Sequence, residues 1–296
     1  MTKNANNPNN PFTTYEWRHT VIPVDQLDPR IIDLLPPELR KAVEKEVGIG
    51  NQQTTEEEPV QKEKIKFDYK MVNCNQDLKE LTTKLKKSKI KQYGILLYGV
   101  SGAGKSFYGQ WLAQELKMPV IKKRASDLND KFVGQTEQNI KKAFQEAKEK
   151  KAILIIDEAD SMLYDRRSST QMYQATAVNE VLTQMEDHPY PFIMTSNLKD
   201  KIDTAALRRF IFKIKYDYMK PENVQAGVKT YFGKEFKLSK EQLDQLKYIC
   251  SGDFKVAKAK VDILENGECT NDMIFKYLLK EQEEKEIKQG SNKINF

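Results

Sequence analysis

Short apolar runs alternate with longer amphipathic segments from about residue 67 onward. Five of the runs have the length and the β-branched or aromatic content of strands, and they lie at 94–99, 119–124, 152–157, 191–196 and 210–218. Strands that alternate with helical segments are typical of a parallel sheet with helices on both faces. The pattern therefore predicts an α/β domain built on a five-stranded parallel sheet.

The segments between and after these runs have helical spacing. Within 136–150, Ile140, Phe144 and Ala147 recur at intervals of four and three residues, which indicates a helix with one buried face. The strand-like runs stop at Pro221, and we expect four helices at 221–233, 239–250, 252–264 and 270–289. The chain is therefore expected to have a large α/β subdomain at 67–218 and a helical lid subdomain with the C-terminal tail at 219–296.

The first 66 residues have a different composition, with much Asn, Pro, Glu and Gln and one apolar island near 26–47. The Pro36-Pro37 pair interrupts or starts a helix in this island. We interpret 1–66 as an appendage and linker. It is either a poorly ordered leader or an arm that recruits an adaptor or a substrate, and the sequence leaves both open.

Composition and charge exclude several classes of protein. The chain has 296 residues, of which 39% are hydrophobic and 31% charged, and no apolar run approaches the roughly 20 residues of a membrane helix. The first ten residues do not have the pattern of a secretory signal, so we expect a cytoplasmic protein without a membrane partner. Three cysteines and two histidines at scattered positions predict neither a disulfide framework nor a zinc site.

A phosphate-binding loop follows the first predicted strand. Residues 99–106 read GVSGAGKS, which matches G-x-x-x-x-G-K-[ST] between a strand and a helix. Glycines let backbone N–H groups face phosphate oxygens, while the lysine reaches the β- and γ-phosphates and the serine holds Mg²⁺. The predicted nucleotide-binding residues are Gly99, Ser101, Gly102, Ala103, Gly104, Lys105 and Ser106.

Two carboxylates end the predicted strand at 152–157. Four consecutive apolar residues before Asp157 suit a central strand that is buried on both faces. Asp157 is then expected to reach the Mg²⁺ shell beside Ser106. Glu158, next to that ligand, is suited to orient and deprotonate a water for attack on the γ-phosphate, which favours hydrolysis over transfer to an acceptor.

Further candidates follow the next strand. Asn197 comes directly after 191–196, where its amide would hydrogen-bond the γ-phosphate or the attacking water, although asparagine is also a common turn residue. Arg208 and Arg209 precede the last predicted strand, and paired guanidinium groups suit the charge of a transferring phosphate. Residues 197–200 read NLKD, which is not the N-K-x-D order typical of guanine recognition, so GTP is not indicated.

With these motifs in order, residues 67 to about 280 resemble the AAA family of P-loop ATPases, including spastin-type, katanin-type and related bacterial members. The segments ILLYGVSGAGKS, AILIIDEADSML and IDTAALRRFIFKIKY are similar to the family's Walker A, Walker B and second region of homology. The resemblance implies ATP and Mg²⁺ as cofactors, Glu158 as catalytic base and Asn197 as sensor of the γ-phosphate. It also implies that Arg208 and Arg209 are arginine fingers for the ATP of a neighbouring subunit in a homo-oligomer, usually a hexameric ring.

Phe132 and Val133 are apolar residues in a polar run, SDLNDKFVGQ, at 126–135. AAA translocases of the type that this chain resembles have an aromatic, hydrophobic, glycine pore loop at this place, which implies that the pair grips a protein substrate. Burial in the core of their own subunit is the competing interpretation.

Three functions follow. The leading hypothesis is a ring-forming, Mg²⁺-dependent ATPase that remodels or unfolds proteins through its pore. The alternative is an AAA-type ATPase that acts on nucleic acid, although the net charge of +6 is mild and the lysine-rich run at 84–91 is typical of a solvated helix face. A non-catalytic scaffold that binds ATP is the third, and Glu158 argues against it.

Overall fold

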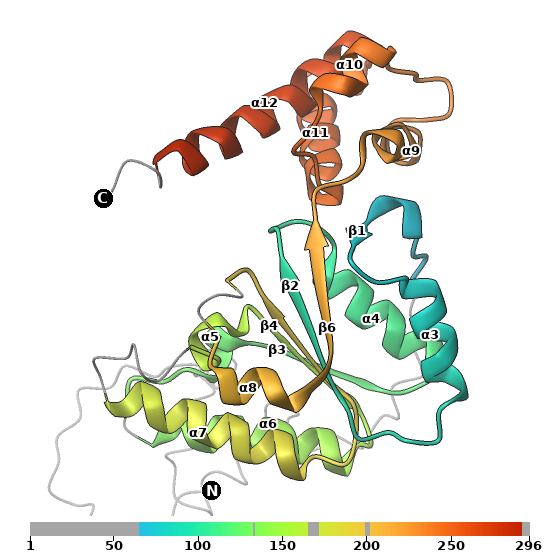
Figure 1. Ribbon diagram of the computed structural model, residues 1–296. Coiled ribbons are helices and arrows are strands. Elements are labelled where there is room, and N and C mark those ends of the chain that lie inside the picture. Colours follow the sequence, from blue (N-terminus) through green and yellow to red (C-terminus); the bar gives the residue numbers. More distant parts are fainter. Residues whose placement is uncertain (1–64, 133, 165–171, 199–201, 292–296) are drawn as a thin grey trace, which may run out of the picture. The chain divides into compact units, whose positions relative to one another are not determined.

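The computed structural model describes residues 65–132, 134–164, 172–198 and 202–291. Most of the predicted N-terminal appendage therefore lies outside the described residues. Figure 1 shows a central sheet between two layers of helices, and β6 leads from this sheet to the C-terminal helices.

The sheet has six strands in the order β1-β6-β2-β5-β4-β3. They are β1 (Asn73–Cys74), β2 (Gly94–Gly99), β3 (Val120–Arg124), β4 (Ile153–Asp157), β5 (Phe192–Ser196) and β6 (Phe210–Asp217). Strands β2 to β6 are parallel, which confirms the predicted sheet. The sixth strand is an addition to the prediction: β1 pairs antiparallel with β6, and its two residues are too few to show an alternating pattern.

The helices fill the connections between strands and form the C-terminal part. The helices are α3 (Leu78–Lys87), α4 (Lys105–Glu115), α5 (Ala125–Leu128), α6 (Gln135–Glu149), α7 (Met172–Asp187), α8 (Thr204–Arg209), α9 (Pro221–Tyr231), α10 (Lys240–Gln245), α11 (Ser251–Leu264) and α12 (Asn271–Ser291). Two short 3₁₀ turns, η3 (Tyr69–Met71) and η4 (Ala159–Met162), follow the N-terminal linker and β4. None of the described helices is long and apolar enough to cross a membrane.

Alternation along the buried strands creates two cores, one on each face of the sheet. In β2, Ile95 and Leu97 pack with α3 and α4, while Leu96 and Tyr98 pack on the opposite face with α6 and α7. Successive strand residues point to opposite faces, so one continuous apolar run supplies both cores. Because both faces are covered, the polar residues after each strand lie at the carboxyl edge of the sheet, where α/β folds bind ligands.

The C-terminal helices have a core of their own. Val228, Leu246, Phe254, Ile274 and Leu278 are fully buried there and come from α9, α11, α12 and the end of α10. Helix α10 ends at Gln245 rather than near Cys250, because Cys250 is already the N-cap of α11. This short connection places the start of α11 next to the phosphate-binding loop.

Candidate nucleotide-binding site

The loop between β2 and α4 has glycine where its backbone requires glycine. Gly99, Gly102 and Gly104 have φ angles of +121°, +75° and +87°, in the left-handed region that other residues rarely adopt. A Cβ at Gly99 would also lie 2.0 Å from the carbonyl oxygen of Tyr216 in β6. The curled backbone leads directly into the N-terminus of α4, a geometry that favours an anionic ligand.

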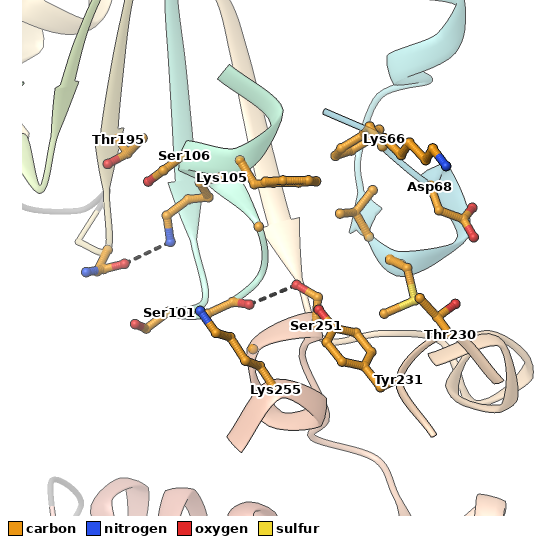
Figure 2. Close-up of a pocket in the computed structure, with 18 of the residues that line it drawn as sticks. Lys66, Asp68, Ser101, Lys105, Ser106, Thr195, Thr230, Tyr231, Ser251 and Lys255 are labelled. Carbon is orange, nitrogen blue, oxygen red and sulfur yellow. Dashed lines mark hydrogen bonds between the residues drawn. The ribbon is translucent and has the colours of Figure 1, made fainter. Parts of the chain in front are cut away.

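Lys105 is buried at the first position of α4, with 7% of its surface exposed. Its ammonium donates hydrogen bonds to the carbonyls of Gly99 (2.9 Å) and Val100 (2.8 Å) and to Oδ1 of Asn197 (2.8 Å). Burial lowers the pKa of Lys105 to about 8, against the attraction of nearby acidic groups. The structure therefore joins two predicted site residues, Lys105 and Asn197, through a direct contact, which is dashed in Figure 2.

Asp157 ends β4 as a buried carboxylate and has three partners. Its Oδ1 accepts hydrogen bonds from Ser106 Oγ at 2.6 Å and Thr195 Oγ1 at 3.2 Å. Its Oδ2 lies 2.8 Å from Nζ of Lys122 in β3. The predicted metal-binding pair, Ser106 and Asp157, is thus in contact, while Thr195 and Lys122 were not among the predicted residues.

Glu158 has a backbone conformation that glutamate rarely adopts. Its φ of +56° lies in the left-handed region, and its N–H donates to Thr195 Oγ1 at 3.0 Å. Such a conformation costs free energy and is often found at functional sites, and Lys117, Lys151 and Asn266 also adopt it in this chain. The turn at the end of β4 separates the roles of two adjacent acids, because Asp157 is buried and Glu158 is exposed to the cavity.

Asp160, two residues beyond Glu158, fixes the end of β5. Its Oδ1 accepts hydrogen bonds from Ser196 Oγ (2.6 Å), Asn197 N (3.1 Å) and Leu198 N (3.2 Å). Asn197 is thereby held at its backbone by Asp160 and at its side chain by Lys105. Sequence reasoning missed this residue, because nothing in the DEAD segment distinguishes an acid that caps a distant strand from one that faces solvent.

The C-terminal helices contact the phosphate-binding loop at one carbonyl. Gly102 O accepts a hydrogen bond from Gly252 N (2.9 Å) and one from Ser251 Oγ (3.0 Å), and Figure 2 shows the latter. A Cβ at Gly252 would lie only 3.2 Å from Gly102 O, so the close approach favours glycine. The start of α11 and the loop therefore move together or break these bonds.

A cavity of about 690 Å³ opens between the loop and the C-terminal helices. Ser101, Gly102, Gly104, Lys105 and Ser106 line it, together with Glu158 and Asn197, whereas Gly99 and Ala103 are not part of its wall. Apolar side chains also line it, among them Phe67, Val72, Phe107 and Tyr231. Figure 2 shows Lys255 of α11 beside the loop, near Ser101. The cavity wall thus combines polar groups with apolar side chains, as small-molecule sites generally do.

Arg208 and Arg209 lie in α8 and are not among the residues that line this cavity. Arg209 donates to Ala205 O at 2.9 Å and forms an ion pair with Glu186 of α7. Arg208 is exposed and has no ion pair or hydrogen bond to another described residue. The structure of one chain therefore holds Arg209 against its own α7 and leaves Arg208 on the surface.

Phe132 lies between α5 and α6 and is 78% exposed. Its N–H donates to Asp130 Oδ1 at 3.0 Å, and its carbonyl accepts from Gln135 N at 3.2 Å, so short-range bonds brace the loop. The competing interpretation, in which Phe132 is buried in the core of its own subunit, is therefore wrong. Val133, the second predicted residue, lies outside the described residues.

Comparison with known proteins identifies the domain. Residues 95–218 match the family described as ATPase family associated with various cellular activities (AAA), a range that includes both the phosphate-binding loop and β6. Residues 95–218 therefore form an AAA domain. The match confirms the resemblance of the sequence motifs to this family.

Three similar proteins illustrate the breadth of the matches. The chain is 33% identical over 156 residues to the uncharacterized protein ORF529 of Acidianus two-tailed virus, which is 48% of this chain and 30% of that protein. It is 37% identical over 121 residues to the peroxisomal ATPase PEX1 of Saccharomyces cerevisiae (39% of this chain, 12% of that protein). It is 28% identical over 167 residues to spastin of Dictyostelium discoideum (54% and 26%). The chain thus spans less than a third of the length of these relatives.

The AAA site fits Mg²⁺ together with a nucleotide. A serine hydroxyl and a carboxylate meet at 2.6 Å, and oxygen ligands of this kind are preferred by Mg²⁺. In the part of the chain that the structure describes, no cluster of three or more His, Cys, Asp or Glu residues could hold a metal ion. Mg²⁺ is usually bound by one or two protein oxygens together with waters and substrate phosphates, and the Ser106–Asp157 pair offers such oxygens.

Proposed function

We propose that this AAA protein binds ATP with Mg²⁺ in the cavity between the loop and α11. It hydrolyses the bond between the β- and γ-phosphates. The observation that carries the proposal is the convergence of Lys105, Glu158 and Asn197 on the wall of one cavity. Three separate loops at the carboxyl edge of the sheet supply these residues. A site that only stored nucleotide would not need a carboxylate in a strained turn beside the phosphate end.

Each residue has a distinct role in this proposal. Lys105 binds the phosphates with its ammonium group. When nucleotide binds, the ammonium gives up its hydrogen bonds to the carbonyls of Gly99 and Val100 and donates to phosphate oxygens instead. Glu158 orients a water and accepts its proton, and Asn197 hydrogen-bonds that water or the γ-phosphate. Ser106 and Asp157 hold Mg²⁺, whose charge offsets that of the phosphates.

Replacement of Glu158 by Gln tests hydrolysis. The amide keeps the size of the side chain but cannot accept the proton, so we expect nucleotide binding to persist while turnover falls by about 10²-fold or more. Binding of a fluorescent ATP derivative and release of phosphate measure the two effects. Glu284→Gln is the matched control, because Glu284 is exposed on α12 and away from the cavity. Equal turnover in both variants would show that Glu158 is not the base.

We further propose that the ATPase works as a homo-oligomer, a hexamer in the usual AAA form, and remodels protein substrates that Phe132 contacts. The exposure of Phe132 on a braced loop supports this, because it leaves the aromatic ring free to contact another molecule. The guanidinium of Arg208 is exposed and has no partner among the residues that the structure describes, which supports the ATP of a second copy as its target. Residues 1–66 would recruit an adaptor, and nucleic acid is the alternative substrate.

A further inference from the structure

Lys122 forms an ion pair with the carboxylate that the proposed function assigns to Mg²⁺. Its Nζ lies 2.8 Å from Asp157 Oδ2, while Ser106 and Thr195 occupy Oδ1. The Asp157 side chain is 9% exposed and that of Lys122 is 38% exposed. The acid is therefore fixed and buried, whereas the lysine approaches it from the solvent side.

The register of the sheet explains why Lys122 reaches this acid. In β3, Lys122 pairs with Ile155 of β4, two residues before Asp157 and on the same face of the sheet. The next residue, Lys123, points to the other face and forms an ion pair with Glu146 of α6 at 3.3 Å. Two adjacent lysines of similar exposure thus serve different acids, and only one of these acids belongs to the site.

A buried carboxylate beside a phosphate-binding loop needs a compensating charge, because an unpaired buried ion is costly. Lysine is suited to a temporary role of this kind. Its flexible stem lets the ammonium move into water without a change of backbone, and the partial exposure of Lys122 leaves that path open. A lysine with a permanent structural role would instead keep this ion pair in every state of the site.

We infer that Lys122 is a built-in counter-ion that competes with Mg²⁺ for Asp157, so that binding of metal and nucleotide displaces its ammonium from Oδ2. The inference rests on the proposed nucleotide site. It predicts that Lys122 weakens the binding of Mg²⁺, that it stabilises the protein without nucleotide, and that its amine becomes more accessible when Mg²⁺ and nucleotide bind together.

The first experiment titrates Mg²⁺ against a fixed concentration of a fluorescent ADP derivative. Lys122→Met keeps the length of the side chain and removes its charge. We expect the Mg²⁺ concentration at half-saturation to fall by about fivefold or more, which is the lower end of the usual coupling between two sites. The midpoint of thermal unfolding in EDTA should fall at the same time. Lys123→Met is the matched control, since its acid lies outside the site, and Lys122→Arg should resemble the wild type.

The second experiment uses the wild-type protein and so does not depend on the folding of a variant. An amine-reactive reagent labels lysines in EDTA, with ADP in EDTA, and with ADP and Mg²⁺, and mass spectrometry reads Lys122. We expect labelling of Lys122 to rise only in the third condition, with Lys123 unchanged. Unchanged labelling, or an Mg²⁺ requirement of Lys122→Met equal to that of Lys123→Met, would overturn the inference alone. If the wild type binds no nucleotide, the proposed function fails as well.

Discussion

Asp157 and His188 are both buried polar residues near the central sheet, but they differ in their partners. Asp157 is held by two hydroxyls and an ammonium, as expected for a carboxylate prepared for a cation. His188 is 3% exposed, its Nε2 has no hydrogen-bond partner among the described residues, and its ring packs against the rings of Phe144 and Phe192. One residue therefore belongs to the site and the other to the core.

His188 should make the stability of the protein depend on pH. Burial lowers the pKa of His188 from 6.5 to about 4, and Lys148 contributes to the same shift. The unfolded chain therefore binds a proton below pH 6.5 that the folded chain accepts only near pH 4. We expect the free energy of unfolding to be unaffected by His188 above pH 6.5. Below pH 6.5 the titration of His188 should lower it by about 1.4 kcal/mol for each pH unit, until the pH reaches about 4.

Denaturant unfolding measures this loss at pH 7, which lies above the window, and at pH 6 and 5, which lie within it. His188→Phe should reduce the slope of stability against pH, because phenylalanine suits an aromatic environment and carries no proton. The comparison concerns the slope and not the absolute stability, which the larger ring also changes. Equal slopes for the two proteins would mean that His188 does not titrate in this range.

At the scale of the elements, the sequence predicts most of the strands and few of the contacts between them. The run at 152–157 contains β4, because four consecutive buried apolar residues are typical of a central strand. Asp157 and Glu158 come directly after these four residues, so their place at the end of the strand could be predicted. The bond from Asp160 to the end of β5, the pair of Lys122 with Asp157 and the contact of Gly252 with Gly102 all join segments far apart in sequence. A local pattern contains no information on such pairings, although it did indicate the loops that make them.

The loop between α5 and α6 lets us test substrate contact. Phe132 is so exposed that its removal should change the stability by no more than about 0.5 kcal/mol, as is usual for surface positions. If the aromatic ring grips polypeptide, Phe132→Ala should abolish the stimulation of the ATPase rate by a reduced and alkylated, permanently unfolded protein. The ratio of stimulated to basal rate is the measurement.

Ile263→Ala is the control for this loop, since Ile263 is 75% exposed in α11 and lies outside the loop. Equal stimulation in both variants would remove Phe132 from substrate contact. If single-stranded DNA stimulates the wild type and the unfolded protein does not, the nucleic-acid alternative replaces protein remodelling.

For the whole molecule, the decisive feature is that the cavity of one chain contains lysine but no arginine among the described residues that line it. Hydrolysis in P-loop ATPases benefits from a guanidinium that offsets charge on the transferring phosphate. Arg209 is engaged by Glu186 and Ala205, whereas Arg208 is exposed and unpaired among the described residues. We therefore expect Arg208 to complete the site of a second copy, and expect the two arginines to differ.

Arg208→Ala should lower turnover by about 10³-fold or more, the lower size of an arginine-finger effect, without loss of stability. Arg209→Ala should chiefly lower stability, and only modestly, because it removes a side chain that is 24% exposed and contacts Ala205 and the exposed Glu186. Phosphate release and thermal unfolding, measured on both variants, separate the two effects. If the Arg209→Ala protein is fully folded and loses a similar amount of turnover, both residues act as arginine fingers.

Mixing two inactive variants tests whether the arginine acts between chains. Lys105→Ala removes the phosphate contact but keeps Arg208, and Arg208→Ala keeps an intact cavity. In a mixed oligomer, each Arg208→Ala chain that neighbours a Lys105→Ala chain receives the missing guanidinium, so turnover should recover in part. Recovery should depend on total protein concentration, because the chains must associate. A mixture that stays inactive, together with a monomeric mass by light scattering in ATP, would show that the ATPase does not work as a ring.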